Sequence, residues 1–103
     1  ANRWNIPDWL ENEIRARDRG CVYCRAPFAS NNSVIKSAPS WEHIINDARI
    51  TTAENIALCC RGCNSSKGQK SLSVWLKSEY CEKRGINAAT VALVVKSAIT
   101  NGA

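Results

Sequence analysis

Residues 41–68 read WEHIINDARITTAENIALCCRGCNSSKG, and this stretch decides the fold. Two of its segments, 41–45 and 56–59, are apolar and contain β-branched residues, which favours β-strands. Residues 46–54 between them are mostly polar and suit a long hairpin connection. The residues that follow, through Lys67, suit a short helix that ends at the next glycine. The stretch therefore predicts two strands followed by a helix.

Four of the six cysteines form two close pairs, Cys21-x-x-Cys24 and Cys60-x-x-Cys63. Each pair can form a knuckle that presents two thiolates to one zinc ion. Disulfides are the alternative, but the first residues lack the apolar stretch of a signal peptide, which favours zinc. Cys59 competes with Cys60 as a ligand. Cys60 is favoured because Cys-Arg-Gly-Cys supplies the glycine that a knuckle turn needs.

Length and composition limit the class of protein. A chain of 103 residues has room for a single domain, and a hydrophobic fraction of 45% argues against a disordered or fibrous chain. No apolar run approaches the roughly 20 residues that a membrane span needs, so a cytoplasmic protein is expected. Fourteen Lys and Arg against nine Asp and Glu leave a net charge of +5, which suits a polyanionic partner.

Helices are expected on both sides of the core. We assign residues 1–103 to one domain, with a core at about 41–70 and helical extensions at 6–19 and 71–101. The first extension carries an apolar stripe at helical spacing: Ile6, Trp9, Leu10 and Ile14. The second divides into a helix over 71–80 and another that Asn87 caps. The expected fold class is α+β. Zinc is expected to hold a hairpin and a helix together, and helices from both ends of the chain are expected to pack against this core.

One histidine is present, His43, and it follows an acidic residue, Glu42. A lone histidine on a strand is usually structural, but its neighbours suggest chemistry. Glu42 is a hard oxygen ligand of the kind that Mg²⁺ and Mn²⁺ prefer. Asn55 and Asn64 place amides on the second strand and on the following helix. Lys67, one turn beyond Asn64, could reach a phosphate.

Together these residues resemble the HNH endonuclease family, whose core is the ββα-metal fold. The resemblance covers about half of the chain and rests on four motifs in order: Cys21-x-x-Cys24, Glu42-His43-Ile44-Ile45, Glu54-Asn55-Ile56-Ala57-Leu58 and Cys60-x-x-Cys63-Asn64-x-x-Lys67-Gly68. It implies that His43 is the general base and that Glu42 occupies the metal-ligand position. Asn55 would be the central asparagine, and Asn64 would take the place of the final histidine.

Three departures from the family pattern concern the geometry. Asparagine stands at 64 instead of histidine, glutamate at 42 where aspartate is frequent, and residues 46–49 replace the usual proline and glycines. In addition, successive residues of a regular strand face opposite ways. Glu42 and His43 therefore need a bulge, a strong twist or a curled glutamate to act on one phosphate.

The resemblance implies a divalent-metal-dependent DNA endonuclease with structural zinc on Cys21, Cys24, Cys60 and Cys63, and with Mg²⁺ or Mn²⁺ on Glu42 and Asn64. A monomer with one site would nick one strand per encounter, whereas dimerisation through residues 87–101 could produce double-strand breaks. Four basic residues are expected to contact the DNA backbone: Lys67, Arg49, Arg61 and Lys70. The main alternative is a non-catalytic, zinc-stabilised module that binds nucleic acid. A redox protein ranks last, because the βαβ pattern is missing.

Overall fold

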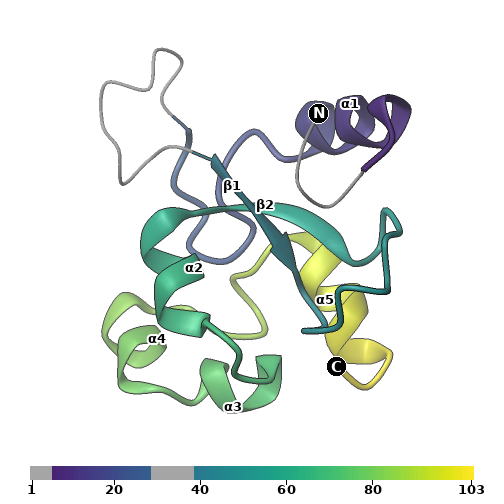
Figure 1. The fold of residues 1–103 in the computed structure, drawn as a ribbon. Helices are drawn as coiled ribbons and strands as arrows, with labels where there is room; N and C mark the ends of the chain where they lie inside the picture. Colours follow the sequence, from purple (N-terminus) through teal and green to yellow (C-terminus); the bar gives the residue numbers. More distant parts are fainter. Residues whose placement is uncertain (1–5, 29–38) are drawn as a thin grey trace.

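The computed structural model describes residues 6–28 and 39–103. These residues form an α+β arrangement in which a two-stranded antiparallel hairpin is followed directly by a helix (Figure 1). The elements in chain order are α1 (Asp8–Arg17), β1 (Pro39–His43), β2 (Ile56–Cys60), α2 (Arg61–Lys67), α3 (Leu72–Leu76), α4 (Glu79–Arg84) and α5 (Leu93–Thr100). Within the described ranges, no helix has both the length and the apolar character that crossing a membrane requires.

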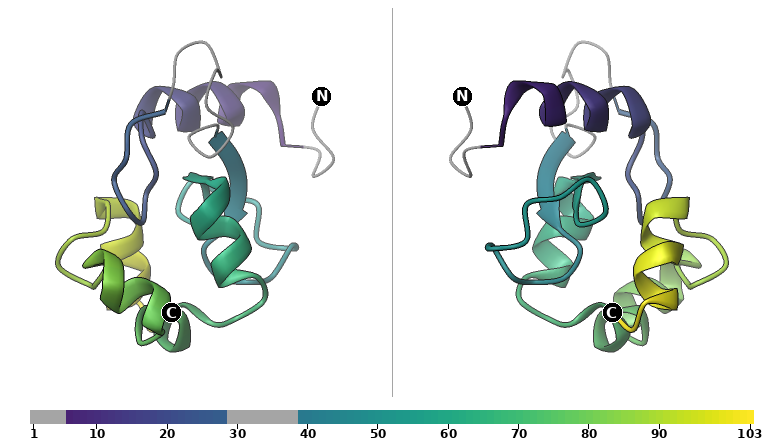
Figure 2. Two further views of the ribbon diagram at one scale, coloured as in Figure 1. Left: turned by 90° about the vertical axis from the view of Figure 1, so that its left-hand side faces the viewer. Right: turned by 90° about the vertical axis from the view of Figure 1, so that its right-hand side faces the viewer.

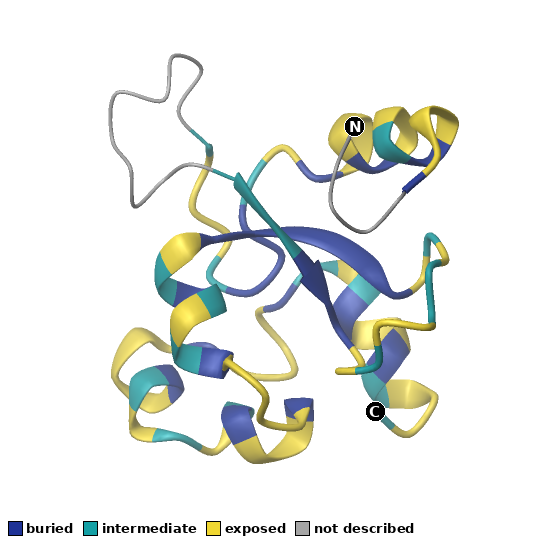
Figure 3. Cartoon of the chain, in the orientation of Figure 1, coloured by how far each residue is buried: buried dark blue, intermediate teal, exposed yellow. Residues whose placement is uncertain are grey.

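The hairpin has an uninterrupted register, from Pro39 opposite Cys60 to His43 opposite Ile56. Every residue of β2 is buried, so this strand is covered on both faces (Figure 3). Its side chains alternate between two apolar clusters, with Ala57 in one and Ile56 in the other. Because the register has no bulge, Glu42 opposite Ala57 and His43 opposite Ile56 obey the ordinary alternation.

Helix α1 covers one face of the hairpin. Ile6, Leu10 and Ile14 pack in one cluster with Ile56 and Leu58 of β2, as their spacing predicts. The expectation that Trp9 joins this stripe is wrong, because its exposed fraction is 68%. At 3.6 residues per turn, Trp9 lies about 100° around the helix axis from its neighbour at position 10, off the buried face.

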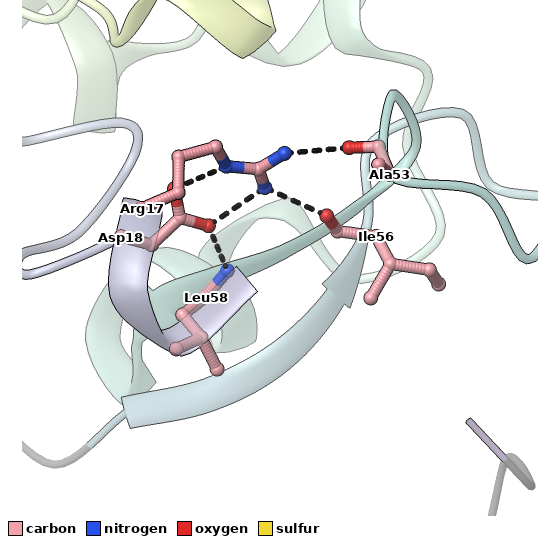
Figure 4. Close-up of polar contacts among 5 residues, drawn as sticks. All are labelled: Arg17, Asp18, Ala53, Ile56 and Leu58. Atoms are coloured by element: carbon pink, nitrogen blue, oxygen red, sulfur yellow. Dashed lines mark hydrogen bonds and ion pairs between the residues drawn. The ribbon is translucent and has the colours of Figure 1, made fainter. Parts of the chain in front are cut away.

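β1 pairs with one edge of β2. The other edge of β2 is covered by the end of α1 and the segment after it (Figure 4). The Asp18 carboxylate accepts a hydrogen bond from the Leu58 N–H at 3.0 Å, and the Leu58 carbonyl accepts one from the Val22 N–H at 3.2 Å. Arg17 donates to the Ile56 carbonyl at 2.8 Å and also binds Asp18. Side chains thus satisfy backbone groups that an open edge would expose.

We expect Asp18→Ala to lower the free energy of unfolding by about 2–3 kcal/mol, because it removes charge-assisted hydrogen bonds from a buried strand edge. Urea unfolding of the metal-loaded protein measures this change. Glu13→Ala, an exposed change on the same helix, serves as the control and should stay within about 0.5 kcal/mol of the parent. Equal losses for the two variants would contradict the role given to Asp18.

Two predictions about the C-terminal helices are corrected. The single helix expected over 71–80 is two helices, α3 and α4, because Ser78 caps a new helix by accepting from the Cys81 N–H. The last helix begins at Leu93 rather than directly after Asn87. The side chain of Asn87 instead closes a turn by accepting from the Ala89 N–H. Helices α3, α4 and α5 lie on the side of the molecule remote from α1 (Figure 2).

Candidate metal centre and catalytic residues

The two cysteine pairs come together in the fold. The sulfur atoms of Cys21, Cys24, Cys60 and Cys63 all lie within 4.8 Å of one another. One pair comes from the turn after α1, and the other spans the end of β2 and the first turn of α2. Four cysteine sulfurs at this separation suit a tetrahedral structural zinc ion. The site joins three segments of a chain whose core is small.

Hydrogen bonds to the sulfur atoms organise this cluster. The Tyr23 N–H donates to Cys21 Sγ at 3.4 Å, and the Cys63 N–H donates to Cys60 Sγ at the same distance. A side-chain hydrogen bond with Cys63 lowers the pKa of Cys21 to about 5, whereas burial raises the pKa of Cys24 to about 11. Donors directed at sulfur stabilise the thiolate form that a metal binds.

Helix α4 adds one further donor to the cluster. The Tyr80 hydroxyl lies 3.5 Å from Cys63 Sγ and donates to it. A side chain at position 62 would come within 3.1 Å of this hydroxyl, so Gly62 leaves room for it. The absence of a side chain at position 62 therefore serves the packing of α4.

The remaining cysteines lie outside the cluster. The interpretation that Cys60 rather than Cys59 belongs to the second pair is confirmed by the grouping of the sulfur atoms. Burial raises the pKa of the Cys59 thiol well above its ordinary value. Cys81 is a free thiol and is fully buried.

Glu42 is held by two partners that come from different elements. Its Oε2 accepts a hydrogen bond from the Tyr23 hydroxyl at 2.7 Å and lies 3.0 Å from Lys67 Nζ. The exposed fractions of the two charged side chains are 7% for Glu42 and 0% for Lys67. This buried group links the first knuckle, β1 and α2. Both contacts fall on one carboxylate oxygen, Oε2.

His43 is the last residue of β1 and is buried. The pKa of its imidazole is lowered, first by burial and also by the charge of Lys67, while Glu42 and Asp47 act in the opposite direction. A lowered pKa keeps the ring neutral at physiological pH, which is the form that accepts a proton. The carbonyl of His43 also accepts a hydrogen bond from Lys67 Nζ at 3.4 Å.

Asn55 holds the connection between the two strands. Its Oδ1 accepts from the Ile45 N–H at 2.6 Å, and its Nδ2 donates to the carbonyls of Ile45 and Ile50 at 3.2 and 3.1 Å. These bonds fix the chain immediately after His43. Asn64 lies on α2, one turn before Lys67, and is half-buried. The helix thus presents Asn64 near the face that meets Glu42.

The four residues expected at the DNA backbone have different environments. Lys67 is enclosed and ion-paired, so in this arrangement its ammonium faces Glu42 rather than solvent. Arg49 is exposed and paired with Asp47 at 2.9 Å. Arg61 is exposed at the start of α2, and the exposed Lys70 donates to the Ser66 carbonyl.

Sequence reasoning missed three contributions to the site. Tyr23 gave no sign that it reaches Glu42, because the two residues are brought together only by the fold. Tyr80 and Arg17 were likewise unmarked, since an aromatic or basic residue on a short helix is usually assigned to packing or solvent. Gly62 was the one signal in the sequence that another side chain, that of Tyr80, packs against the second knuckle.

Comparison with known proteins gives one significant match among curated proteins. The chain is 27% identical over 84 residues to the CRISPR-associated endonuclease Cas9 of Corynebacterium diphtheriae. The match covers 79% of this chain but 7% of the relative, so the chain corresponds to a small part of a much larger protein. No family model matches, and no solved structure matches significantly. The similarity, at this identity, indicates a distant relationship to a nuclease.

Proposed function

We propose that this chain is an HNH-type nuclease domain that hydrolyses phosphodiester bonds in DNA, with His43 as the general base. The observation that carries the proposal is a buried His43 next to Glu42 at the end of β1, where Lys67, on the helix that bears Asn64, contacts the Glu42 carboxylate and the His43 carbonyl. The cysteine cluster that ties this hairpin to α2 and the similarity to an endonuclease support it. DNA is the proposed substrate, and nicking of one strand is the proposed product.

The residues present suit the chemistry in the following way. Neutral His43 would take a proton from the attacking water, because burial keeps its pKa low. Glu42 and Asn64 would hold a divalent cation, and Oε1 is the oxygen of Glu42 that remains for it, since Tyr23 and Lys67 both bind Oε2. When bound, Mg²⁺ or Mn²⁺ supplies Lewis-acid stabilisation of the phosphate. Asn55 would keep the loop after His43 in position.

The alternative function is a non-catalytic, zinc-stabilised module that binds nucleic acid. One observation favours it: the Glu42 carboxylate already has a cationic partner, Lys67, and a hydrogen bond from Tyr23. A carboxylate that is satisfied in this way can be purely structural. The two functions differ in what they require of His43.

Incubation of the zinc-loaded protein with supercoiled plasmid tests the proposal. We expect conversion to open circles with added Mg²⁺ or Mn²⁺, and a rate lower by about 10²–10⁴-fold in His43→Ala, because the general base is lost. The cation-free reaction should be prepared by omitting the cation, since a chelator would also attack the cysteine site. Asn46→Ala, an exposed change in the same loop, is the matched control and should keep its activity.

DNA binding by His43→Ala separates the two functions. Under the nuclease proposal the variant binds the plasmid but leaves it intact, and its zinc content and circular dichroism match those of the parent. A wild-type chain that shifts the plasmid without cutting it in either cation would contradict the nuclease proposal and favour the binding module.

A further inference from the structure

A basic cavity of about 280 Å³ lies between the C-terminal end of α1, the first knuckle and the start of α5. Its walls include Arg17, Arg19 and Arg25, and Asp18 is the acidic residue among the described residues that line it. An adjoining hollow of about 380 Å³ shares Arg17, Asp18 and Arg25 and continues along the first turn of α5. Three arginines therefore meet at one opening in the surface.

One arginine and the aspartate neutralise each other. Arg17 binds both carboxylate oxygens of Asp18, at 2.7 and 2.9 Å, and its remaining donors reach the carbonyls of Ala53 and Ile56 (Figure 4). The guanidinium groups of Arg19 and Arg25 differ, because neither has an ion-pair or hydrogen-bond partner among residues 6–28 and 39–103. The cavity thus carries about two uncompensated positive charges.

The turn of the first knuckle fixes the main chain of these two exposed arginines. Arg19 and Arg25 stand on either side of the bridge between Gly20 and Pro27, on opposite arms of the turn. Arg25 has a left-handed backbone, with φ of 68°, and its N–H donates to the Cys21 carbonyl at 2.9 Å. The cysteine cluster therefore fixes the main chain from which both side chains extend, which lowers the entropic cost of placing them on a ligand.

The first turn of α5 contributes to the same opening. Ala92, the N-cap residue, donates its N–H to the Val22 carbonyl at 2.8 Å and offers no capping side chain. The positive end of the helix dipole is therefore directed at the hollow next to Arg25. This field adds to the attraction that the two arginines exert on an anion.

The cavity is separate from the candidate catalytic residues. Val22 and Asp18 bind the edge of β2 that β1 leaves free, so the first knuckle lies on the far side of β2 from β1. Figure 2 shows the segment after α1 running toward α5 on one side of the molecule, with β1 on the other. An anion in the cavity is therefore not the phosphate that His43 would act on.

We infer that the cavity binds phosphate groups of a nucleic-acid strand, with Arg19 and Arg25 as the direct contacts. The inference rests on the proposed function, since it assigns a second contact to the same substrate class. Guanidinium groups match phosphate geometry with two parallel hydrogen bonds and keep their charge at any physiological pH. Such a contact would hold the nucleic acid away from the cleavage site, and it positions nucleic acid without reading its sequence.

The double variant Arg19→Gln/Arg25→Asn tests this inference. Asparagine is chosen at 25 because it tolerates the left-handed backbone that residue adopts. Lys77→Gln/Lys83→Gln removes the same charge from two exposed positions, the C-cap of α3 and the last turn of α4, and is the matched control. Both are combined with His43→Ala, so that binding of short fluorescein-labelled DNA is followed by anisotropy without cleavage.

We expect the arginine variant to weaken binding uniformly across sequences and to reduce the slope of log K against log salt by about two, one for each phosphate contact. The lysine variant should change the slope much less. Zinc content and circular dichroism should stay unchanged in both, because neither arginine has a partner to lose among the described residues and the Lys83–Glu79 ion pair of the control is exposed.

Equal salt slopes for the two double variants would overturn the inference, while nicking by the parent chain would leave the nuclease proposal intact. If the parent itself binds neither duplex nor single-stranded DNA, both fail together. Thermal stabilisation of the parent by inorganic phosphate, with equal DNA slopes, would also overturn it, because the cavity would then serve a free anion.

Discussion

Cys60→Ser is expected to unfold the chain, whereas Cys59→Ala at the preceding position is expected to leave fold and zinc content intact. Cys60 Sγ belongs to the four-sulfur cluster and lies 3.8 Å from Cys24 Sγ. Cys59 is also buried, but its sulfur is not one of the four in the cluster. Binding of structural zinc contributes about 10–16 kcal/mol in small zinc modules, which exceeds the stability of most domains of this size.

The measurement combines metal analysis with circular dichroism and thermal unfolding. For Cys60→Ser we expect less than one zinc per chain and loss of the cooperative transition. For Cys59→Ala we expect one zinc per chain and a loss of about 1 kcal/mol, as for an ordinary core change. If Cys59→Ala loses the metal and Cys60→Ser retains it, the assignment of the second knuckle is wrong.

The same cluster explains why chelation should act as a denaturant here. The knuckle after α1 covers the free edge of β2, and its partner knuckle begins α2. Without the metal, only hydrogen bonds and a small core connect these elements, and domains near this size often need a staple. Removal of zinc should therefore expose the free edge of β2 and release α2 in the same step. The effect should not be confined to a local turn.

The cysteine cluster could be predicted from the sequence because its geometry is local. Two residues between paired cysteines are enough to specify a knuckle, and this spacing gives Cys60 rather than Cys59, as the sulfur cluster confirms. The glycine argument for Cys60 is not confirmed, because Gly62 lies in α2 and has no left-handed backbone. The hairpin was predictable for a similar reason, since two apolar segments on either side of a polar connection have few other ways to be buried. Its register then follows from which residues must face the core.

The helix boundaries show where local reasoning fails. Residues 71–84 have nearly continuous helical character, and nothing in their apolar spacing marks a break. The break occurs because the Ser78 side chain accepts from the Cys81 N–H and restarts the helix in a new direction. Serine is favoured at the start of helices and tolerated inside them, so Ser78 alone is a weak signal of the break.

The surroundings of Glu42 could not be predicted, because its partners are distant in sequence. Tyr23 and Lys67 lie far from it along the chain, and each has a more common role as a core or surface residue. From the sequence, Glu42 was therefore expected to bind a cation and Lys67 to contact a phosphate. The fold instead pairs the two charges with each other, which changes what a substitution at either position should do.

Lys67→Met is accordingly expected to lower the free energy of unfolding by about 3–5 kcal/mol, because it leaves the buried Glu42 carboxylate without its counter-charge. Methionine keeps the length and the unbranched shape of the side chain, so packing changes little. Urea unfolding of the zinc-loaded protein measures the loss. Lys70→Met, an exposed change three residues later, is the control and should stay within about 0.5 kcal/mol.

The double variant Glu42→Gln/Lys67→Met separates charge from packing. If the loss in Lys67→Met comes from an uncompensated charge, neutralising Glu42 as well should recover a large part of it, so the two changes will not add. Additive losses would mean that the pair is not coupled. Tyr23→Phe should cost less than Lys67→Met, because it removes one hydrogen bond to a charged group and no counter-charge.

The same variants decide whether Lys67 serves DNA or the fold. A lysine that contacts the backbone would weaken DNA binding when replaced and would leave stability unchanged, as Lys70→Met is expected to do. A lysine that holds Glu42 would do the reverse. The 0% exposed fraction of Lys67 and its 3.0 Å contact with Oε2 favour the second outcome. In that case the ion pair also fixes the orientation of Glu42, and the proposed cation ligand depends on Lys67 for its position.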